Sequence, residues 1–395
     1  MKLWWRAGGL CLATVTSHVP FLEAQLQDIR GYILNVSVPT LSGPLNSESF
    51  SNLSRFRLMT RATAGPASFE IAYEHLTTYS STSRGVVPSA LAGGTGNTDW
   101  LPLQGNLHEG SHLSWRHKLD RLALSITDAA GTELTLGRQT LSWATTLILT
   151  PADPFVPFDP ADPFREYRAG VDAIRVHYFP GPLSELEFAL RPSKTAFGNT
   201  LTALGRGHAV VESWELAAWL GVVHDEAAAS FGFTKTLLGA ALRGESTVRR
   251  SEDRTVLRFV IGIDGGISIG GKNLYTVIEY RRDGFGFSSV DGLLQTAMSK
   301  PARRGELQAL GRDVVALQTQ YPLHPLISVQ QLSLVNLNDG SVLFTPSLAY
   351  SARDNLSVNV GAFLGVGPNL TPEGIPASEF GPLPTTGFAS LSAYF

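Results

Sequence analysis

Cysteine is almost missing from the sequence, since Cys11 is the one example among 395 residues. This residue lies in an N-terminal stretch with the features of a cleaved leader, so we expect a mature chain without disulfide bonds or thiol chemistry. Charge is also scarce, because charged residues make up 16% of the chain and the formal net charge is −3. Such a composition, with no basic patch, argues against nucleic acid as a partner.

Long hydrophobic runs are missing as well, although hydrophobic residues make up 43% of the chain. No run approaches the 18 apolar residues that mark a transmembrane helix, so a helical membrane protein is excluded. A soluble chain of this length would ordinarily divide into two or three domains. A transmembrane β-barrel stays one domain at any strand number, and residues 25–395 are predicted to form a single barrel of this kind.

The N-terminus has the composition of a signal peptide. Lys2 and Arg6 supply the positive region, and Ala7 to Val15 form a short apolar stretch. Ala24 is a small residue ahead of Gln25, so residues 1–24 are predicted to be removed. An ordinary N-terminal strand is the alternative for this segment.

Segments with a period of two residues dominate the rest of the chain, and this period is typical of strands with one apolar face. Residues 53–63 and 67–77 are the first strong examples. Their apolar face contains Phe56, Leu58, Phe69 and Ile71, which are predicted to face outward. Their charged face contains Arg55, Arg57, Arg61, Glu70 and Glu74.

A tight turn around Gly65 would join these two segments into a hairpin. The hairpin would set Arg61 opposite Glu70 and Arg57 opposite Glu74. Opposite charges that face each other across two strands stabilise the pair. The charge pattern therefore agrees with the hydrophobic pattern in predicting an antiparallel hairpin.

The same alternation predicts an all-β protein with 18 strands. The predicted strands are residues 29–38, 53–63, 67–77, 112–127, 131–142, 171–180, 184–192, 200–210, 213–223, 227–236, 239–250, 254–264, 272–282, 312–321, 327–336, 341–350, 354–365 and 386–395. Residues 214–231 are rich in alanine and could be helical, so 16 strands is the alternative count. Both counts are even, as expected for a single-chain bacterial barrel.

Short turns alternate with long loops along the chain. The short turns lie near residues 64–67, 128–131, 180–183, 322–326 and 351–354, and the long loops near 39–52, 78–111, 144–170, 283–311 and 366–385. Up-and-down barrels of the bacterial outer membrane have short periplasmic turns and long outer loops, so both termini are predicted to be periplasmic. The chain ends in Phe395, which resembles the assembly signal of outer-membrane proteins and predicts the barrel-assembly machinery as a partner, besides outer-membrane lipid.

Unusual motifs concentrate between residues 136 and 173. They are Gly137-Arg138-Gln139, Trp143, Pro151-Ala152-Asp153 and Gly170-Val171-Asp172-Ala173. This stretch resembles porin-like outer-membrane barrels related to the alginate-export group, although Ala144 stands where that group has glycine. The resemblance implies a barrel that passes a small or polymeric solute, and it names no substrate.

Proline recurs through residues 151–163, which would keep this part of the loop extended with few amide donors. Two placements stay open, because the loop could fold into the lumen as a plug or remain a stiff exposed loop. If it folds inward, the residues predicted to line a constriction are Trp143, Asp153, Asp159, Asp162, Arg165, Glu166, Arg168 and Asp172.

No metal or cofactor is predicted. The spacing of Asp153, Asp159 and Asp162 fits no calcium-binding loop, so these carboxylates are expected to be solvated. His108 and His112 lack the further ligands that a zinc site needs.

The charged face of each strand is predicted to line a water-filled lumen. The candidate pore-lining residues are Arg55, Arg57, Arg61, Glu70, Glu74, Arg138, Gln139, Arg175, Glu185, Glu187, Arg258 and Glu279. Facing charges of opposite sign would create a transverse field that filters solutes by charge and dipole. The alternative role for these charges is to keep the interior wet and to fix the register of the hairpins.

The sequence therefore predicts an outer-membrane porin for passive or facilitated diffusion of small hydrophilic solutes, with saccharides among the candidates. The alternatives are a plugged structural or adhesin barrel and a barrel hydrolase. Residues 266–270 match the G-x-S-x-G pattern of hydrolases, but predicted strands flank them on both sides. A nucleophile elbow needs a helix after the serine, so no enzyme activity is predicted.

Overall fold

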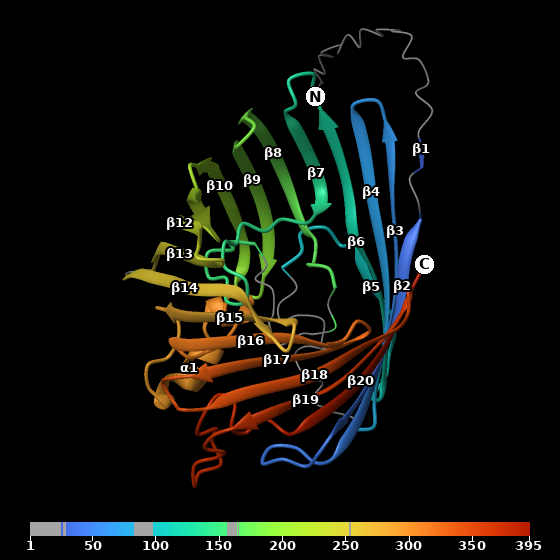
Figure 1. Ribbon diagram of the computed structural model, residues 1–395, viewed down its shortest axis with the longest axis vertical. Coiled ribbons are helices and arrows are strands. Elements are labelled where there is room, and N and C mark those ends of the chain that lie inside the picture. Colours follow the sequence, from blue (N-terminus) through green and yellow to red (C-terminus); the bar gives the residue numbers. More distant parts are fainter. Residues whose placement is uncertain (1–24, 27–28, 83–97, 156–163, 165, 253) are drawn as a thin grey trace, which may run out of the picture.

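The computed structural model describes residues 25–26, 29–82, 98–155, 164, 166–252 and 254–395. Within these residues, 18 antiparallel strands form a closed barrel, because β20 pairs with β2 as well as with β19 (Figure 1). The barrel strands are β2 (Arg30–Thr40), β3 (Ser49–Ala64), β4 (Ala67–Ser80), β6 (Leu113–Thr127), β7 (Glu133–Gln139), β8 (Val171–Gly181), β9 (Ser184–Thr195), β10 (Gly198–Val211), β11 (Trp214–Val223), β12 (Glu226–Leu237), β13 (Ala240–Ser251), β14 (Arg254–Ile269), β15 (Lys272–Asp283), β16 (Asp313–His324), β17 (Ile327–Asn336), β18 (Val342–Arg353), β19 (Leu356–Val366) and β20 (Thr386–Tyr394).

The predicted count of 18 strands is confirmed, and each predicted strand overlaps one observed strand. The helical alternative for residues 214–231 is wrong, because these residues form β11 and the first half of β12. Both strands are paired along their length with β10 and β13, and Trp219 is buried while its neighbour Leu220 is exposed. The pairing and the alternation across the wall outweigh the helical propensity of alanine.

Two short strands lie outside the predicted set. β1 (Gln25–Leu26) pairs with the end of β3, and β5 (Gln104–Glu109) pairs with the first half of β6. β7 pairs only with the second half of β6, so β5 occupies the edge of β6 that β7 leaves free. The wall of the barrel is thus completed by a segment that belongs to a loop.

The connections differ between the two ends of the barrel. One end, called here the turn end, has short connections such as residues 65–66, 182–183 and 270–271, and it also holds the C-terminus beside the start of β2. The other end, called the loop end, has the connections 41–48, 81–112, 140–170, 284–312 and 367–385. This alternation confirms the predicted pattern of short turns and long loops.

Side chains alternate between the two faces of the wall, as β14 shows. Val256, Arg258 and Val260 are buried, whereas Leu257 and Ile261 are about half exposed. The outward faces of the other strands carry a similar belt of exposed apolar side chains. This distribution places the polar face of the wall inside and the apolar face outside, as in barrels that sit in lipid.

The predicted hairpin is confirmed by the pairing of β3 with β4, which sets Arg61 opposite Glu70 and Arg57 opposite Glu74. Phe69 is 41% exposed on the outer face. The four predicted outward residues, Phe56, Leu58, Phe69 and Ile71, belong to none of the buried clusters formed by the described residues.

Helix is confined to the loop between β15 and β16 in the described part of the chain. It consists of the 3-10 turn η1 (Val290–Gly292) and the short helices α1 (Leu293–Ala297) and α2 (Lys300–Arg303). Among the described residues, no helix is long and apolar enough to cross a membrane.

Candidate functional site

The loop between β7 and β8 enters the lumen, which decides between its two predicted placements (Figure 1). Its described residues 148–155 and 164 are buried, whereas Leu147, Glu166 and Tyr167 are exposed. Asp159, Asp162 and Arg165, which were predicted to line a constriction, lie outside the described residues. The segment 140–155 is called the lumen loop below.

Three apolar clusters join this loop to three different sectors of the wall. Trp143 near the start of the loop and Phe155 farther along it pack together against β8 to β12, with their ring centroids 4.9 Å apart. At its middle, Ile148 and Leu149 pack against β14 to β18. Farther along, Phe164 packs edge-on against Phe388 and lies in the cluster of β2, β3 and β20. The loop is therefore seated against most of the inner circumference.

The root of the loop is fixed by a buried ion pair. Arg138 at the end of β7 donates to both carboxylate oxygens of Asp172 on β8, at 2.8 Å each, and to the carbonyl of Leu101 at 2.9 Å. Asp172 also accepts the backbone N–H groups of Trp100 and Leu101 at 2.8 Å. This pair thus holds together the end of β7, the start of β8 and the segment that leads to β5.

Glycine is required beside this ion pair. Gly137 has φ of +110°, and a Cβ at this position would lie 2.2 Å from the carbonyl oxygen of Leu122. The neighbouring Gln139 is buried and donates to the carbonyl of Ala173 at 3.0 Å. The Gly-Arg-Gln motif therefore marks the point where the chain leaves the wall, and its Arg138 and Gln139 are buried there.

A second group of charges lies on the wall of β3, β4 and β6. Arg57 contacts Glu74 at 2.9 Å and Asp120 at 2.7 Å. Arg55 contacts Glu74 at 3.5 Å and donates to the carbonyl of Phe164 at 3.0 Å. Burial of all these side chains below 10% exposure means that they are covered by the returning part of the loop.

A cavity of about 320 Å³ opens beside this group. It is lined by Glu74, Leu76, Gln104, Gly105, Asn106, Arg116, His117 and Lys118, which come from β4, β5 and β6. Arg116 forms no ion pair within the described residues, whereas Lys118 contacts Glu74 and Asp120. The cavity thus presents a free guanidinium and two side-chain amides to the lumen.

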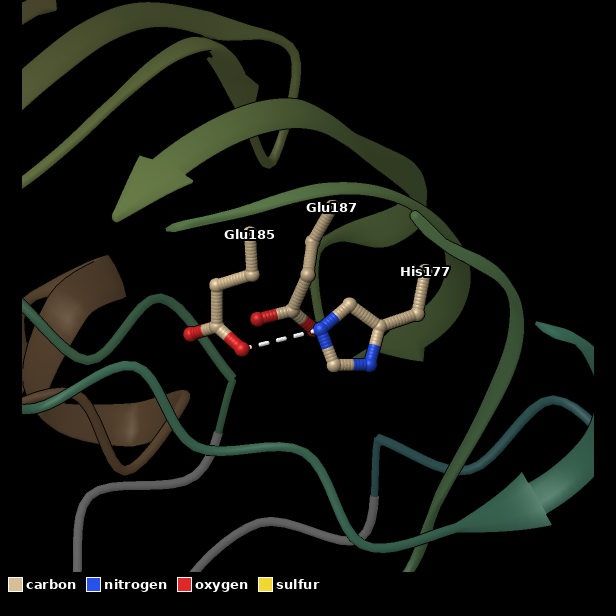
Figure 2. Close-up of side chains that lie close together, drawn as sticks. All are labelled: His177, Glu185 and Glu187. Carbon is tan, nitrogen blue, oxygen red and sulfur yellow. Dashed lines mark hydrogen bonds and ion pairs between the residues drawn. The ribbon is translucent and has the colours of Figure 1, made fainter. Parts of the chain in front are cut away.

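A third group lies near the turn end on β8, β9 and β10. Figure 2 shows His177, Glu185 and Glu187 close together, with His177 bonded to Glu185 at 2.9 Å. Their ligand atoms lie close enough to hold a metal ion. However, Arg206 contacts both carboxylates, at 2.8 and 2.6 Å, and Arg175 contacts Glu187 at 2.6 Å. The guanidinium of Arg206 already takes the place of a cation, so the group is an ion-pair network.

Three further predicted residues also form ion pairs. Arg61 and Glu70 form an exposed ion pair at 3.1 Å, and Arg258 contacts Asp283 at 2.9 Å. Glu166 accepts a hydrogen bond from the hydroxyl of Tyr394.

Asp153 and Arg168 pair at 2.7 Å inside the loop, and the hydroxyl of Ser142 also donates to this carboxylate. Burial raises the pKa of the Asp153 carboxyl, and the charge of Arg168 opposes that rise. Those predicted constriction residues that the structure describes therefore contact each other or the wall.

Several residues of these networks were missing from the prediction. Asp120 occupies a β-bulge between β4 and β6, so it and Arg121 are both buried although they are adjacent. The two consecutive charges in the sequence were the available signal for this irregularity. Glu245 contacts the loop from 93 to 100 residues away and Arg191 from 36 residues away, and the alternation alone could not single them out.

The comparisons with known proteins give matches only at the level of structure. No protein-family model matches the chain, and no curated protein sequence matches it. The solved structures include a BenF-like porin from Pseudomonas fluorescens Pf-5, with a TM-score of 0.57 and 10% identity over 94% of this chain and 98% of that one.

Two further porins give similar figures. Pseudomonas aeruginosa OccK2 (OpdF) has a TM-score of 0.55 and 11% identity, and it covers 93% of this chain and 98% of its own. Pseudomonas aeruginosa OpdK, solved with vanillate, has a TM-score of 0.53 and 11% identity over 93% and 98%. The chain therefore has the closed 18-strand fold of these porins.

Proposed function

We propose that the chain is a bacterial outer-membrane channel for the diffusion of small hydrophilic solutes. The observation that supports this function best is the charged lumen, which holds an inward loop and a cavity of about 320 Å³ lined by residues of β4, β5 and β6. An 18-strand barrel has an interior too wide for wall side chains alone to fill. An arginine on the lipid face would cost roughly 2–4 kcal/mol, which explains why the arginines of the wall are gathered inside.

The proposal includes a location and an orientation. Residues 1–24 act as a signal peptide, residues 25–395 form the mature barrel, and the turn end faces the periplasm. Phe395 at the end of β20 serves as the assembly signal for the barrel-assembly machinery. The motifs around Arg138 and Asp172 support a relation to the alginate-export group.

Selectivity in this proposal comes from the lumen charges and the lumen loop. The free guanidinium of Arg116 and the amides of Gln104 and Asn106 meet the solute first, from the loop end. The pairs Arg57–Glu74 and Arg175–Glu187 supply charges of both signs along the wall. The channel uses no cofactor and performs no covalent chemistry.

A plugged structural or adhesin barrel is the second candidate. The seating of the connection between β7 and β8 against three sectors of the wall favours this alternative. A hydrolase has less support, because Ser268 lies in β14 and is followed by a turn and β15 instead of a helix.

Planar-bilayer recording separates these candidates. The purified barrel is expected to give discrete single-channel currents, and liposomes that contain it should swell in a neutral disaccharide and in a small carboxylate. The carboxylate is included because vanillate occupies one of the similar porins. A folded barrel that gives neither currents nor swelling would rule out the channel and leave the plugged barrel.

A further inference from the structure

The lumen loop has a backbone that is hydrogen-bonded by wall side chains instead of by secondary structure. Two wall carboxylates accept hydrogen bonds from most of the backbone N–H groups between residues 145 and 152. Glu245 on β13 accepts the N–H groups of Thr145, Thr146 and Ala152, at 2.8, 3.2 and 3.0 Å.

Glu279 on β15 accepts the N–H groups of residues 147–149, which follow Thr146 in the loop. The distances to Leu147 and Leu149 are both 2.7 Å, and Ile148 donates to both oxygens at 3.2 and 3.1 Å. Gln308 accepts the N–H of Thr150 at 2.6 Å. Every backbone N–H group from residue 145 to residue 152 is therefore bound to a side chain outside the loop, since residue 151 is proline.

Both carboxylates are buried without a cation. Glu245 is 3% exposed and Glu279 is 1% exposed, and neither forms an ion pair within the described residues. A buried carboxylate is costly unless hydrogen bonds compensate it, and six backbone donors supply that compensation here. The loop amides thus stabilise the two buried carboxylates of the wall, and the carboxylates in turn hold the loop against the wall.

Glycines of the wall make room for this arrangement. Gly262 on β14 stands opposite Glu279, and a Cβ at Gly262 would lie 2.6 Å from Cγ of that glutamate. Gly232 on β12 stands opposite Glu245, and a Cβ there would lie 2.4 Å from Oγ1 of Thr145. The four strands where the loop is seated therefore alternate between a glycine, on β12 and β14, and a carboxylate, on β13 and β15.

We propose that Glu245 and Glu279 are positioning residues that hold the lumen loop in place by its backbone and so set the free width of the lumen. This inference rests on the proposed channel function. The glutamates act through the loop, and they need not contact the solute.

The test replaces both residues, as Glu245→Gln with Glu279→Gln. Glutamine keeps the size of glutamate but puts an amide donor where one oxygen accepted, so each site loses part of its contacts. We expect a shift of the single-channel conductance from its wild-type level and a rise in open-channel noise. Glu133→Gln is the matched control, because this wall glutamate bonds to Thr135 on its own strand and contacts no described residue of the lumen loop.

A disulfide lock provides the rescue. Thr145→Cys with Gly232→Cys would place the two Cβ atoms about 3.2 Å apart, and a shift of the loop by a few tenths of an ångström would bring them into the range of about 3.5–4.5 Å found in disulfides. In the double glutamine variant this pair should restore the wild-type conductance when oxidised and lose it again when reduced. A wild-type conductance in the unlocked glutamine variant, or no effect of reduction on the locked one, would overturn the inference.

Hydrogen exchange on the wild-type barrel tests the same inference without a variant. The amides of residues 145–152 should be protected from exchange to a degree similar to strand amides. Exchange at the rate of free amides would refute the proposed hold of the two glutamates on the loop backbone. If the wild-type barrel carries no current, the channel function fails while the exchange result still decides the positioning role. A wild-type barrel that conducts while its loop amides exchange freely would keep the channel function and refute the positioning role of the two glutamates.

Discussion

Replacing Asp172 with asparagine tests the structural account of the loop root. The ion pair that Asp172 forms with Arg138 is buried, with side-chain exposures of 5% and 1%. Asparagine would keep the shape but remove the negative charge and one of the two acceptor oxygens, so that among the described residues Asp99, at 3.2 Å, is the remaining ion-pair partner of Arg138. Removal of one partner of a buried pair costs about 3–5 kcal/mol, a large part of a typical stability of about 5–15 kcal/mol.

The assay is urea unfolding of the barrel in lipid vesicles, followed by tryptophan fluorescence. Arg61→Ala is the comparison, because its pair with Glu70 is exposed at 52% and 40% and should contribute less than about 1 kcal/mol. Combining Asp172→Leu with Arg138→Met should cost less than Asp172→Asn alone, since the buried guanidinium is then removed together with its carboxylate partner. If Asp172→Asn costs no more than Arg61→Ala, the root is not held by this ion pair.

Three further predictions concern the channel and its export. Deleting residues 151–163 should raise the conductance in planar bilayers, because the loop then no longer crosses the lumen; an unchanged conductance would mean that the solute path avoids the loop. Arg116→Glu should shift the reversal potential toward cation preference with little loss of stability, since Arg116 has no protein partner among the described residues; an unmoved potential would remove this residue from the path. N-terminal sequencing of protein from the outer-membrane fraction should begin near Gln25, and an intact Met1 on a cytoplasmic protein would contradict both leader and location.

The strands were predictable because a barrel wall repeats one local rule. Each strand must put its apolar side chains toward lipid and its polar ones inside, so the period of two recurs 18 times. The hairpin of β3 and β4 was predictable down to its register, since Arg57 and Arg61 find Glu74 and Glu70 opposite them. β5 was not predictable in this way, because it is a short segment with little alternation that pairs with an edge left free by another strand.

The environment of the lumen charges was harder to predict than their direction. Arg57 was expected to line a wet pore, but it is 2% exposed between Glu74 and Asp120 and lies 4.9 Å from the ring of Tyr167. Charge reversal at Arg57 would bring three carboxylates together, so its effect on ion preference would be confounded by lost stability. Arg116 is the better probe because it lines the cavity and forms no ion pair with any residue that the structure describes.

The lumen loop shows why local sequence patterns could not predict how the interior of the barrel is packed. Residues 140–152 carry no charge, although they lie in a lumen lined by charged side chains. The wall supplies the charges instead, since Glu245 and Glu279 bind the N–H groups of the loop while Arg258 donates to the carbonyl of Pro151 at 3.0 Å. These partners are about 90 to 130 residues away in the sequence. A loop whose polar backbone is bound by the wall can present apolar side chains to the wall, which is why an uncharged segment is stable inside a charged barrel.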